Sequence, residues 1–479
     1  MKILFYHPTS KSDGYPEPPL GLGYLMTIAN KKQYSYEFYD EDHHSKFLPL
    51  DDVIQQFRPE LYAVTFMTPQ YYEAFKAIKR FKELTPQAKI IVGGPHPSAL
   101  PEDTLKEIKD IDFLCKGEGE KTFEDFLDFL KNKKSLNDID GLYYHEKGQI
   151  FSNRLRELMS KEELEEYRVD WNKILEYGPY KQKLVYTDKI ERALSVITTR
   201  GCPFQCTFCD EGNIWQRKAR MRTIESVIDE IKWLHRNFKT NHFNILDDTF
   251  TLNKSRVIQF CNKITPLKIK FRITAKTTTI DKEMLQNLKE AGCQVVAFGV
   301  ESGDENVLRL MKKKQTIADI KHAFKLTHEV GISSYALCMV GNIGEDMNAV
   351  KKTAKLIKEI KPDFFSCSIM TPYPGSENYK ICKKNGWILH YNWEHWVPSV
   401  LKIKNFKVVS RTDKMDDKDM LNAYYFINRS VLFNRFTGKY TNFFFFNFRF
   451  YINEVFPRVK TIGVKSFLLH FINVISKKA

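Results

Sequence analysis

The chain has 479 residues, of which 43% are hydrophobic and 14% aromatic, and its formal net charge is +15 at pH 7. This composition excludes a disordered chain and predicts two or three domains, because single cores rarely grow beyond about 250–300 residues. No run approaches 18 apolar residues and the first residues have a strand pattern, so we expect no transmembrane helix, no signal peptide and a cytoplasmic location.

Residues 1–135 alternate short β-rich runs with stretches of helical periodicity. Five strands, each followed by a helix, predict an α/β domain with a doubly wound, flavodoxin-like parallel sheet. Such sheets bind ligands at the carboxyl ends of their strands. The predicted strands are 2–6, 34–40, 61–66, 89–92 and 112–115, and the predicted helices are 20–31, 51–57, 71–84, 102–108 and 120–131.

Two glycine-containing turns follow the last two strands of this domain. Gly93 and Gly94 precede His96, and Gly117 precedes Glu118. Because glycine has no Cβ, a bulky planar ligand can lie against such a backbone. Two tight turns of an ordinary α/β domain are the alternative interpretation.

A polar connector, 136–188, with a predicted hairpin over 141–151, leads to a second strand–helix series in 189–398. This series has six strands, too few to close an eight-stranded barrel, and function in such units collects at the carboxyl ends of the strands. The predicted strands are 194–199, 242–246, 270–275, 294–300, 334–340 and 364–370, and the helices are 224–238, 254–264, 282–291, 317–330 and 347–360.

Three cysteines, Cys202, Cys206 and Cys209, follow the first strand of this series. Thiolates at this spacing on one loop can bind three irons of a cubane cluster, which leaves the fourth iron open for a substrate or cofactor. A structural zinc site needs a fourth ligand, and no Cys or His occurs in the 25 residues after Cys209. We therefore expect cluster chemistry here. The remaining cysteines are expected in the core: Cys115, Cys261, Cys293, Cys338, Cys367 and Cys382.

With Phe208 just before the third cysteine, this loop resembles the signature of the radical S-adenosylmethionine (SAM) superfamily. Residues 1–135 resemble the cobalamin (B12)-binding domain that precedes many radical SAM domains. The resemblance implies a partial (β/α)6 barrel for the second series and three cofactors, a 4Fe–4S cluster, SAM and cobalamin. The matching motifs of the first domain are Pro18-Pro19-Leu20-Gly21-Leu22-Gly23-Tyr24, Gly93-Gly94-Pro95-His96 and Gly117-Glu118-Gly119-Glu120.

The Asp-x-His-x-x-Gly motif of cobalamin-dependent mutases and methionine synthase is absent. The nearest approach, Asp42-His43-His44, lacks the glycine. We therefore assign no histidine to cobalt and expect His43 and His44 at the surface.

The resemblance also implies roles for single residues, although it identifies no catalytic side chain. Glu301 would accept hydrogen bonds from ribose hydroxyls of SAM. The turn after the fifth strand keeps Gly341 but departs from the family pattern at Ile343 and Asp346. The implied cluster ligands are Cys202, Cys206 and Cys209, the SAM contacts Phe208, Asp247, Asp248, Glu301 and Gly341, and the cobalamin contacts Gly93, Gly94, His96, Gly117 and Glu118.

The function implied by this resemblance is reductive SAM cleavage at the cluster with C-methylation of an unactivated carbon, a methyltransferase activity. A small-molecule or lipid-like substrate and an electron donor such as flavodoxin or ferredoxin are expected partners. A radical SAM cyclase or other oxidative rearrangement, similar to the anaerobic Mg-protoporphyrin ester cyclase, stays open as an alternative. So does a non-catalytic iron–sulfur redox protein.

The C-terminal region, 399–479, is basic and aromatic, and we expect it to be mainly helical. Residues 401–479 carry 15 Lys and Arg but 5 Asp and Glu, so most of the net charge lies there and the rest is nearly balanced. This distribution argues against nucleic-acid binding and for a local basic face. The aromatic run 440–451 and the amphipathic pattern 462–472 either cap the barrel or contact an anionic membrane or apolar substrate.

Overall fold

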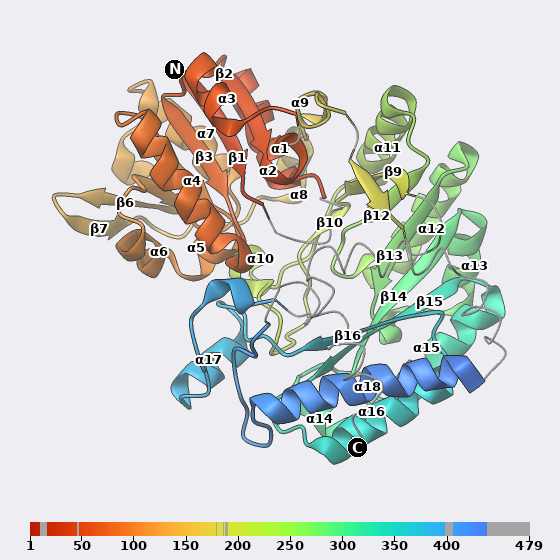
Figure 1. Ribbon diagram of the computed structural model, residues 1–479. Helices are drawn as coiled ribbons and strands as arrows, with labels where there is room; N and C mark the ends of the chain where they lie inside the picture. Colours follow the sequence, from red (N-terminus) through yellow and green to blue (C-terminus); the bar gives the residue numbers. More distant parts are fainter. Residues whose placement is uncertain are drawn as a thin grey trace.

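The computed structural model describes residues 1–9, 17–45, 47–178, 180–184, 186, 190–397 and 406–437. Two seven-stranded sheets, each flanked by helices, dominate these residues (Figure 1). The predicted tail segments 440–451 and 462–472 lie outside the described residues.

The first sheet has the strand order β2-β1-β3-β4-β5-β6-β7, and β1 to β5 are parallel. Side chains alternate between its faces: Ile3 and Phe5 pack under one helical layer, and Leu4 and Tyr6 under the other. Both faces are thus covered, and the prediction of a doubly wound sheet is confirmed. The strands are β1 (Lys2–His7), β2 (Ser35–Asp40), β3 (Leu61–Thr65), β4 (Lys89–Gly93) and β5 (Phe113–Cys115). The first layer contains α1 (Leu20–Lys31) and α7 (Glu120–Leu130), and the second α3 (Leu50–Phe57), α4 (Tyr71–Leu84) and α6 (Pro101–Glu107).

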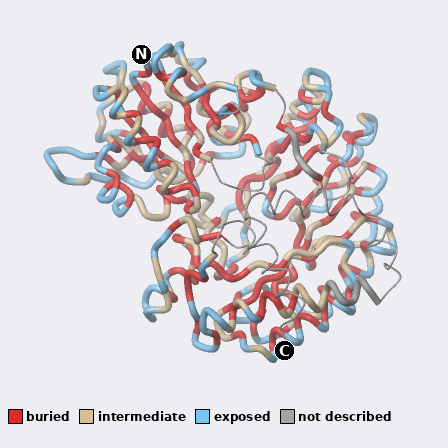
Figure 2. Tube along the Cα trace, in the orientation of Figure 1, coloured by how far each residue is buried: buried red, intermediate tan, exposed pale blue. Residues whose placement is uncertain are grey.

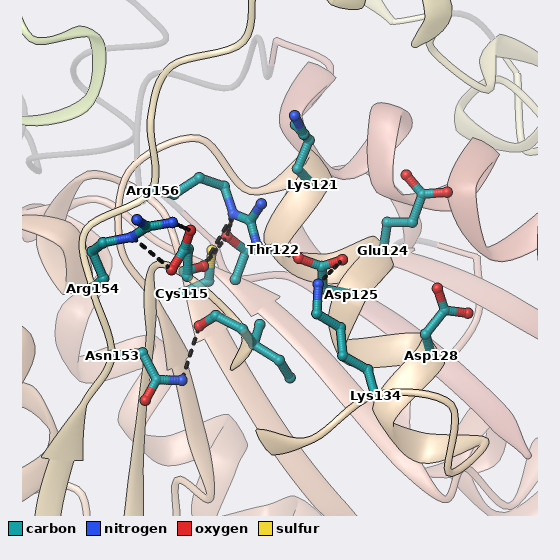
Figure 3. A network of polar contacts seen from close by, with 12 residues as sticks. Cys115, Lys121, Thr122, Glu124, Asp125, Asp128, Lys134, Asn153, Arg154 and Arg156 are labelled. Carbon is teal, nitrogen blue, oxygen red and sulfur yellow. Dashed lines mark hydrogen bonds and ion pairs between the residues drawn. The ribbon is translucent and has the colours of Figure 1, made fainter. Parts of the chain in front are cut away.

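The connector does more than bridge the two sheets. Its hairpin, β6 (Leu142–Glu146) and β7 (Gln149–Ser152), pairs antiparallel with β5 and extends the first sheet. Arg156 then reaches back to Thr122 Oγ1 (2.8 Å) and to Asp125 of α7 (Figure 3). These contacts hold the connector against the first half of α7 (Glu120–Leu130), although the sequence suggested only a polar link.

The second sheet has the order β16-β15-β14-β13-β12-β9-β8, in which all neighbours are parallel except β8 (Lys181–Lys183). Its strands are buried at the centre of this half of the molecule, and the helices form the outer layer (Figures 1 and 2). The sheet does not close, as expected for a partial barrel. The parallel strands are β9 (Ile190–Val196), β12 (His242–Ile245), β13 (Lys270–Ala275), β14 (Cys293–Glu301), β15 (Ser333–Val340) and β16 (Phe364–Ile369). The outer helices are α11 (Ile224–Phe238), α12 (Lys254–Ile264), α13 (Lys282–Glu290), α15 (Ile317–Val330) and α16 (Met347–Ile360).

The C-terminal region contributes α18 (Asp417–Thr437), which packs against α16 and β16. Met420, Ala423 and Ile427 are fully buried in that contact. This helix therefore behaves as a cap on the barrel. Among the described residues, no helix combines the length and apolarity that crossing a bilayer requires.

The six other cysteines are buried, as predicted. The expectation that His44 lies at the surface is wrong: its side chain is buried, Asp40 N–H donates to its Nδ1 (3.1 Å) and its ring contacts Phe38 and Tyr177. Burial lowers the pKa of His44 to about 4. Tyr177 comes from the connector, which the sequence pattern did not place over this helix.

Candidate functional site

The three cysteines lie on a loop between two short paired strands, β10 (Thr199–Arg200) and β11 (Arg220–Met221). Cys206 is buried and the other two are half-buried. The backbone N–H of Cys202 donates to Glu211 Oε1 (2.8 Å), and Arg217 Nη1 donates to the Phe204 carbonyl (2.7 Å). Side chains of the loop thus hold its own backbone in one conformation.

Two lysines lie against this loop. Lys276 Nζ stands 3.8 Å above the Phe204 ring, and Lys313 Nζ lies 5.4 Å from the Phe208 ring. Burial acts to lower the pKa of Lys313, but Glu301 and the neighbouring Cys206 outweigh it, so this pKa is raised and the cation is retained. Burial lowers the pKa of Lys276, so Lys313 is the cation that its surroundings favour on this side, which suits an anionic thiolate-bound cluster.

Burial raises the pKa of Cys202, and it raises that of Cys209 to about 12. Burial therefore favours the protonated thiol at Cys202 and Cys209, so loading a metal there would release protons. Among the described residues, no group of three Cys, His, Asp or Glu side chains converges on a point that one metal ion would occupy. A cubane cluster does not need such convergence, because each thiolate binds a different iron. The loop fits a cluster better than a zinc ion.

The two acids after β12 have different surroundings. Asp247 is buried and accepts hydrogen bonds from Thr198 N–H (2.7 Å), Thr199 N–H (3.0 Å) and the Thr198 hydroxyl (2.6 Å). Asp248 reaches solvent although protein surrounds much of it; this partial burial and the carboxylates of Asp247 and Asp210 raise its pKa to about 6. Of the two predicted SAM contacts, Asp248 is the one open to a ligand.

Glu301 ends β14 in a left-handed conformation, with φ +61°, at a break in the register with β15. Its Oε1 accepts a hydrogen bond from Lys313 Nζ at 2.8 Å, and both side chains are 12% exposed. Such backbone geometry is uncommon for a residue with a Cβ and is concentrated at functional sites. Lys313 was not predicted as a site residue, because Lys312-Lys313-Lys314 has the pattern of a solvated charged run.

The turn after β15 is closed by the C-terminal helix. A Cβ at Gly341 would stand 2.9 Å from Met420 Sδ of α18, so a ligand can approach this residue only from its backbone side. Glu345, in the same turn, is fully buried and accepts from Asn342 N–H (3.0 Å) through Oε2, and its Oε1 has no hydrogen-bond partner among the described residues. Burial raises the pKa of Glu345 to about 7.

In the first sheet, the turn after β4 is filled by the protein. A Cβ at Gly94 would lie 2.6 Å from Thr65 Oγ1, whereas one at Gly93 would make ordinary contact with the Cys115 carbonyl at 3.6 Å. His96 is buried beside Thr68 and Trp393, and burial lowers its pKa to about 3. These three predicted cobalamin contacts thus lie mainly against protein atoms.

The turn after β5 is open instead. Apart from Gly117 itself and its two chain neighbours, no atom of the described residues lies within 4 Å of the Cβ position at Gly117. This residue borders a cavity of about 210 Å³. Its other walls are the neighbours of Gly117 in the turn (116 and 118), residues 155–158, the first three residues of α10 (Gly212–Trp215) and Gln216. The volume is below the 300–1,000 Å³ of usual small-molecule pockets, so this cavity by itself is too small for a whole corrinoid.

Glu118, the last predicted cobalamin contact, lines the same cavity, but its carboxylate is engaged by the protein. Oε1 lies 3.1 Å from Arg200 Nη1, and Oε2 lies 2.6 Å from Arg220 Nη1. α10, which directly follows the cysteines, also packs against α5 (Pro95–Ala99) of the first domain (Figure 1). The structure therefore brings the β5 turn and the cysteine loop together.

Comparisons with known proteins identify both domains. The radical SAM superfamily model matches residues 196–357, and the B12 binding domain model matches residues 7–127. A protein of Pyrococcus horikoshii described as an uncharacterized methyltransferase is 30% identical over 85% of this chain and 89% of its own length. The anaerobic magnesium-protoporphyrin IX monomethyl ester cyclase of Cereibacter sphaeroides is 27% identical over 84% of this chain and 67% of its own.

The fold likeness extends over nearly the whole chain. The structure of OxsB, a cobalamin-dependent S-adenosylmethionine radical enzyme with aqua-cobalamin and S-adenosylmethionine bound, has a TM-score of 0.72. It covers 99% of this chain and 78% of OxsB at 16% identity. At this identity the likeness concerns the fold alone.

Proposed function

The chain belongs to the radical SAM enzymes that carry a B12-binding domain, and from this membership we propose that it is a cobalamin-dependent C-methyltransferase. The relative that is 30% identical along most of both chains is described as a methyltransferase, which favours this reaction. The proposed substrate is a small or lipid-like molecule with an unactivated carbon.

The observation that carries the proposal is the contact between the two candidate cofactor sites. α10 begins three residues after Cys209 and forms a wall of the cavity that Gly117 borders. A corrinoid at the edge of the first sheet would therefore lie beside the cysteine loop. This proximity is what a reaction that uses both cofactors requires, because reacting groups must be held in near contact.

Each proposed role follows from the surroundings of the side chain. Cys202, Cys206 and Cys209 would hold the cluster, and Lys313 would balance its negative charge. When bound, the cluster supplies the electron that cleaves SAM, and cobalamin carries a methyl group.

Three further residues would position SAM. Asp248 is open to solvent and would receive the ammonium group. Glu301, oriented by Lys313, would accept hydrogen bonds from the ribose hydroxyls. Gly341 would contribute backbone contacts only, since Met420 fills its Cβ side.

A second candidate reaction is an oxidative cyclisation with the same cofactors. The cyclase relative, 27% identical over 84% of this chain, supports it. Product mass separates the two reactions: methylation adds the mass of one methylene group, and cyclisation removes hydrogen.

The test is SAM cleavage by protein purified and reconstituted without oxygen, with iron, sulfide and hydroxocobalamin, and reduced by flavodoxin or a chemical reductant. We expect 5′-deoxyadenosine from the parent protein and none from the variant in which Cys202, Cys206 and Cys209 are all replaced by alanine. That variant should lose the brown cluster chromophore and keep its circular dichroism spectrum. Equal SAM cleavage by parent and triple variant would contradict the proposal.

Two proposals concern partners and rest on the sequence. Flavodoxin or ferredoxin would deliver the electron. The basic region 399–479 would contact anionic membrane surfaces, supported by its excess of Lys and Arg. Sedimentation with anionic liposomes at low and high salt tests the proposed membrane contact. Binding that does not depend on salt concentration or on lipid charge would contradict it.

A further inference from the structure

Two arginines stand at the base of the cysteine loop. Arg200 ends β10, two positions before Cys202, and Arg220 begins β11; the two are cross-strand partners. The Trp215 ring of α10 lies 5.5 Å from the Arg200 guanidinium and 5.7 Å from that of Arg220. The pair therefore closes the loop of residues 201–219, which carries all three cysteines and α10.

The charged partners of both arginines come from the first domain. Glu118 bonds to Arg200 through Oε1 (3.1 Å) and to Arg220 through Oε2 (2.6 Å), and Glu120 Oε1 lies 2.6 Å from Arg200 Nη2. The ring of Tyr24, in α1, covers the Arg200 guanidinium at 4.6 Å. Three motifs from distant parts of the sequence thus meet at Arg200: the Pro-Pro-Leu-Gly-Leu-Gly-Tyr segment, the Gly-Glu-Gly-Glu turn and the cysteine loop.

These four charged groups form a neutral, buried network. The side chain of Glu118 is 3% exposed and that of Arg200 is 4% exposed. The cost of removing such charges from water offsets much of their attraction, so a buried ion-pair network is weak evidence of stability. A guanidinium is planar and rigid, and contacts to two carboxylates restrict its orientation. The turn 117–120 therefore determines where the base of the cysteine loop lies.

We infer that Glu118 is a positioning residue that holds the cysteine loop at a set distance from the ligand site bordered by Gly117. Glu118 is suited to this because it lines the cavity and bonds both arginines of the loop. The inference rests on the proposed function, since it places a corrinoid and a cluster on the two sides of this network. It assigns Glu118 a role through the arginines, in place of the direct cobalamin contact that the family resemblance implied.

The test uses the full-length protein loaded with cluster and hydroxocobalamin and then reduced. Double electron–electron resonance spectroscopy measures the distance between the reduced cluster and cob(II)alamin, and this distance reports the separation of the two sites. Glu118→Gln keeps the shape of the side chain and removes its charge. We expect it to bind both cofactors but to broaden the distance distribution by about 1 Å, the scale on which an unsupported site loosens. The matched control is Glu102→Gln, because Glu102 pairs with Lys106 within α6, at 64% and 60% exposure, and is not a member of the arginine network.

A second measurement needs no cofactor. Hydrogen exchange of the apo protein should show amides of residues 201–219 exchanging about tenfold faster in Glu118→Gln than in parent and control. If Glu118→Gln does not fold, Glu120→Gln, which removes one contact, replaces it under the same criteria. Unchanged distances and unchanged exchange would overturn the inference while leaving the proposed function intact. If the parent binds neither cofactor, the proposed function fails, and exchange alone then judges whether Glu118 positions the loop.

Discussion

The ends of β4 and β5 are neighbours in the first sheet, and a glycine-containing turn follows each, yet their surroundings are opposite. At Gly94, with φ +99°, the protein itself comes close, since a Cβ would lie 2.6 Å from Thr65 Oγ1. At Gly117, with φ +85°, the space is open and leads to the cavity. The same residue type thus permits tight packing in one turn and leaves open space beside a cavity in the next.

The second sheet repeats this contrast with carboxylates. Asp247 is saturated by donors from residues 198 and 199, whereas its neighbour Asp248 reaches solvent. We call a residue closed where protein atoms surround it or satisfy its polar groups, and open where it faces solvent or a cavity. The two kinds of residue should respond differently to substitution. Stability should depend on the closed residues, and binding on the open ones.

The largest effect is expected at the closed turn. Gly94→Ala adds a Cβ to a crowded position with positive φ, so we expect a loss of about 3–5 kcal/mol in the free energy of unfolding, from strain and overpacking together. Gly117→Ala has positive φ but no crowding and should cost about 1 kcal/mol. Urea denaturation of both variants measures this difference. Equal losses would mean that the two turns do not differ as described.

The next effect separates the paired acids. Asp247→Asn turns an amide donor toward groups that already donate, and we expect about 2–3 kcal/mol of destabilisation. Asp248→Asn should leave the unfolding free energy within about 0.5 kcal/mol of the parent and weaken SAM binding instead. Thermal unfolding and calorimetric SAM titration give the two readouts. A destabilised Asp248→Asn with normal SAM affinity would reverse the assignment.

A pH dependence tests the closed carboxyl of Glu345. Its pKa is about 7 in the folded protein, against an ordinary value of 4.5 in the unfolded chain. Between pH 4.5 and pH 7 the folded state therefore binds a proton that the unfolded state has lost. Stability should therefore fall as pH rises from about 4.5 to about 7, by at most about 3 kcal/mol. Glu345→Gln, which stays neutral, should flatten this part of the curve. An identical pH profile in parent and variant would show that Glu345 does not titrate there.

The smallest effect is expected at Glu301, which is partly closed by Lys313. Glu301→Gln keeps the shape but weakens the charged contacts, and SAM affinity should drop by about 1–2 kcal/mol. Isothermal titration with SAM under anaerobic conditions measures it, with Glu329→Gln as an exposed control on α15. Unchanged affinity would make Glu301 a structural partner of Lys313 only.

Much of the fold was predictable because its signals are local. The first and last residues of six helices agree with the ranges predicted from their hydrophobic period: α1, α4, α11, α12, α15 and α16. Short elements such as α10 and the β10–β11 pair were not anticipated, since they have too few residues to show a period. The cysteine loop was recognisable from spacing alone, whereas Lys313 was hidden in a run of three lysines.

The sequence by itself determined the alternation of strands and helices, the two strand–helix series and the cysteine spacing, because each depends on residues close together in the chain. Only the tertiary structure decided that Gly94 and Asp247 are closed by the protein, that Gly117 and Asp248 remain open, and that Glu118 bonds to Arg200 and Arg220. The physical reason is that a carboxylate or a glycine has no fixed role until its neighbours are known. Those neighbours come from segments 82 and 102 residues away in the case of Glu118.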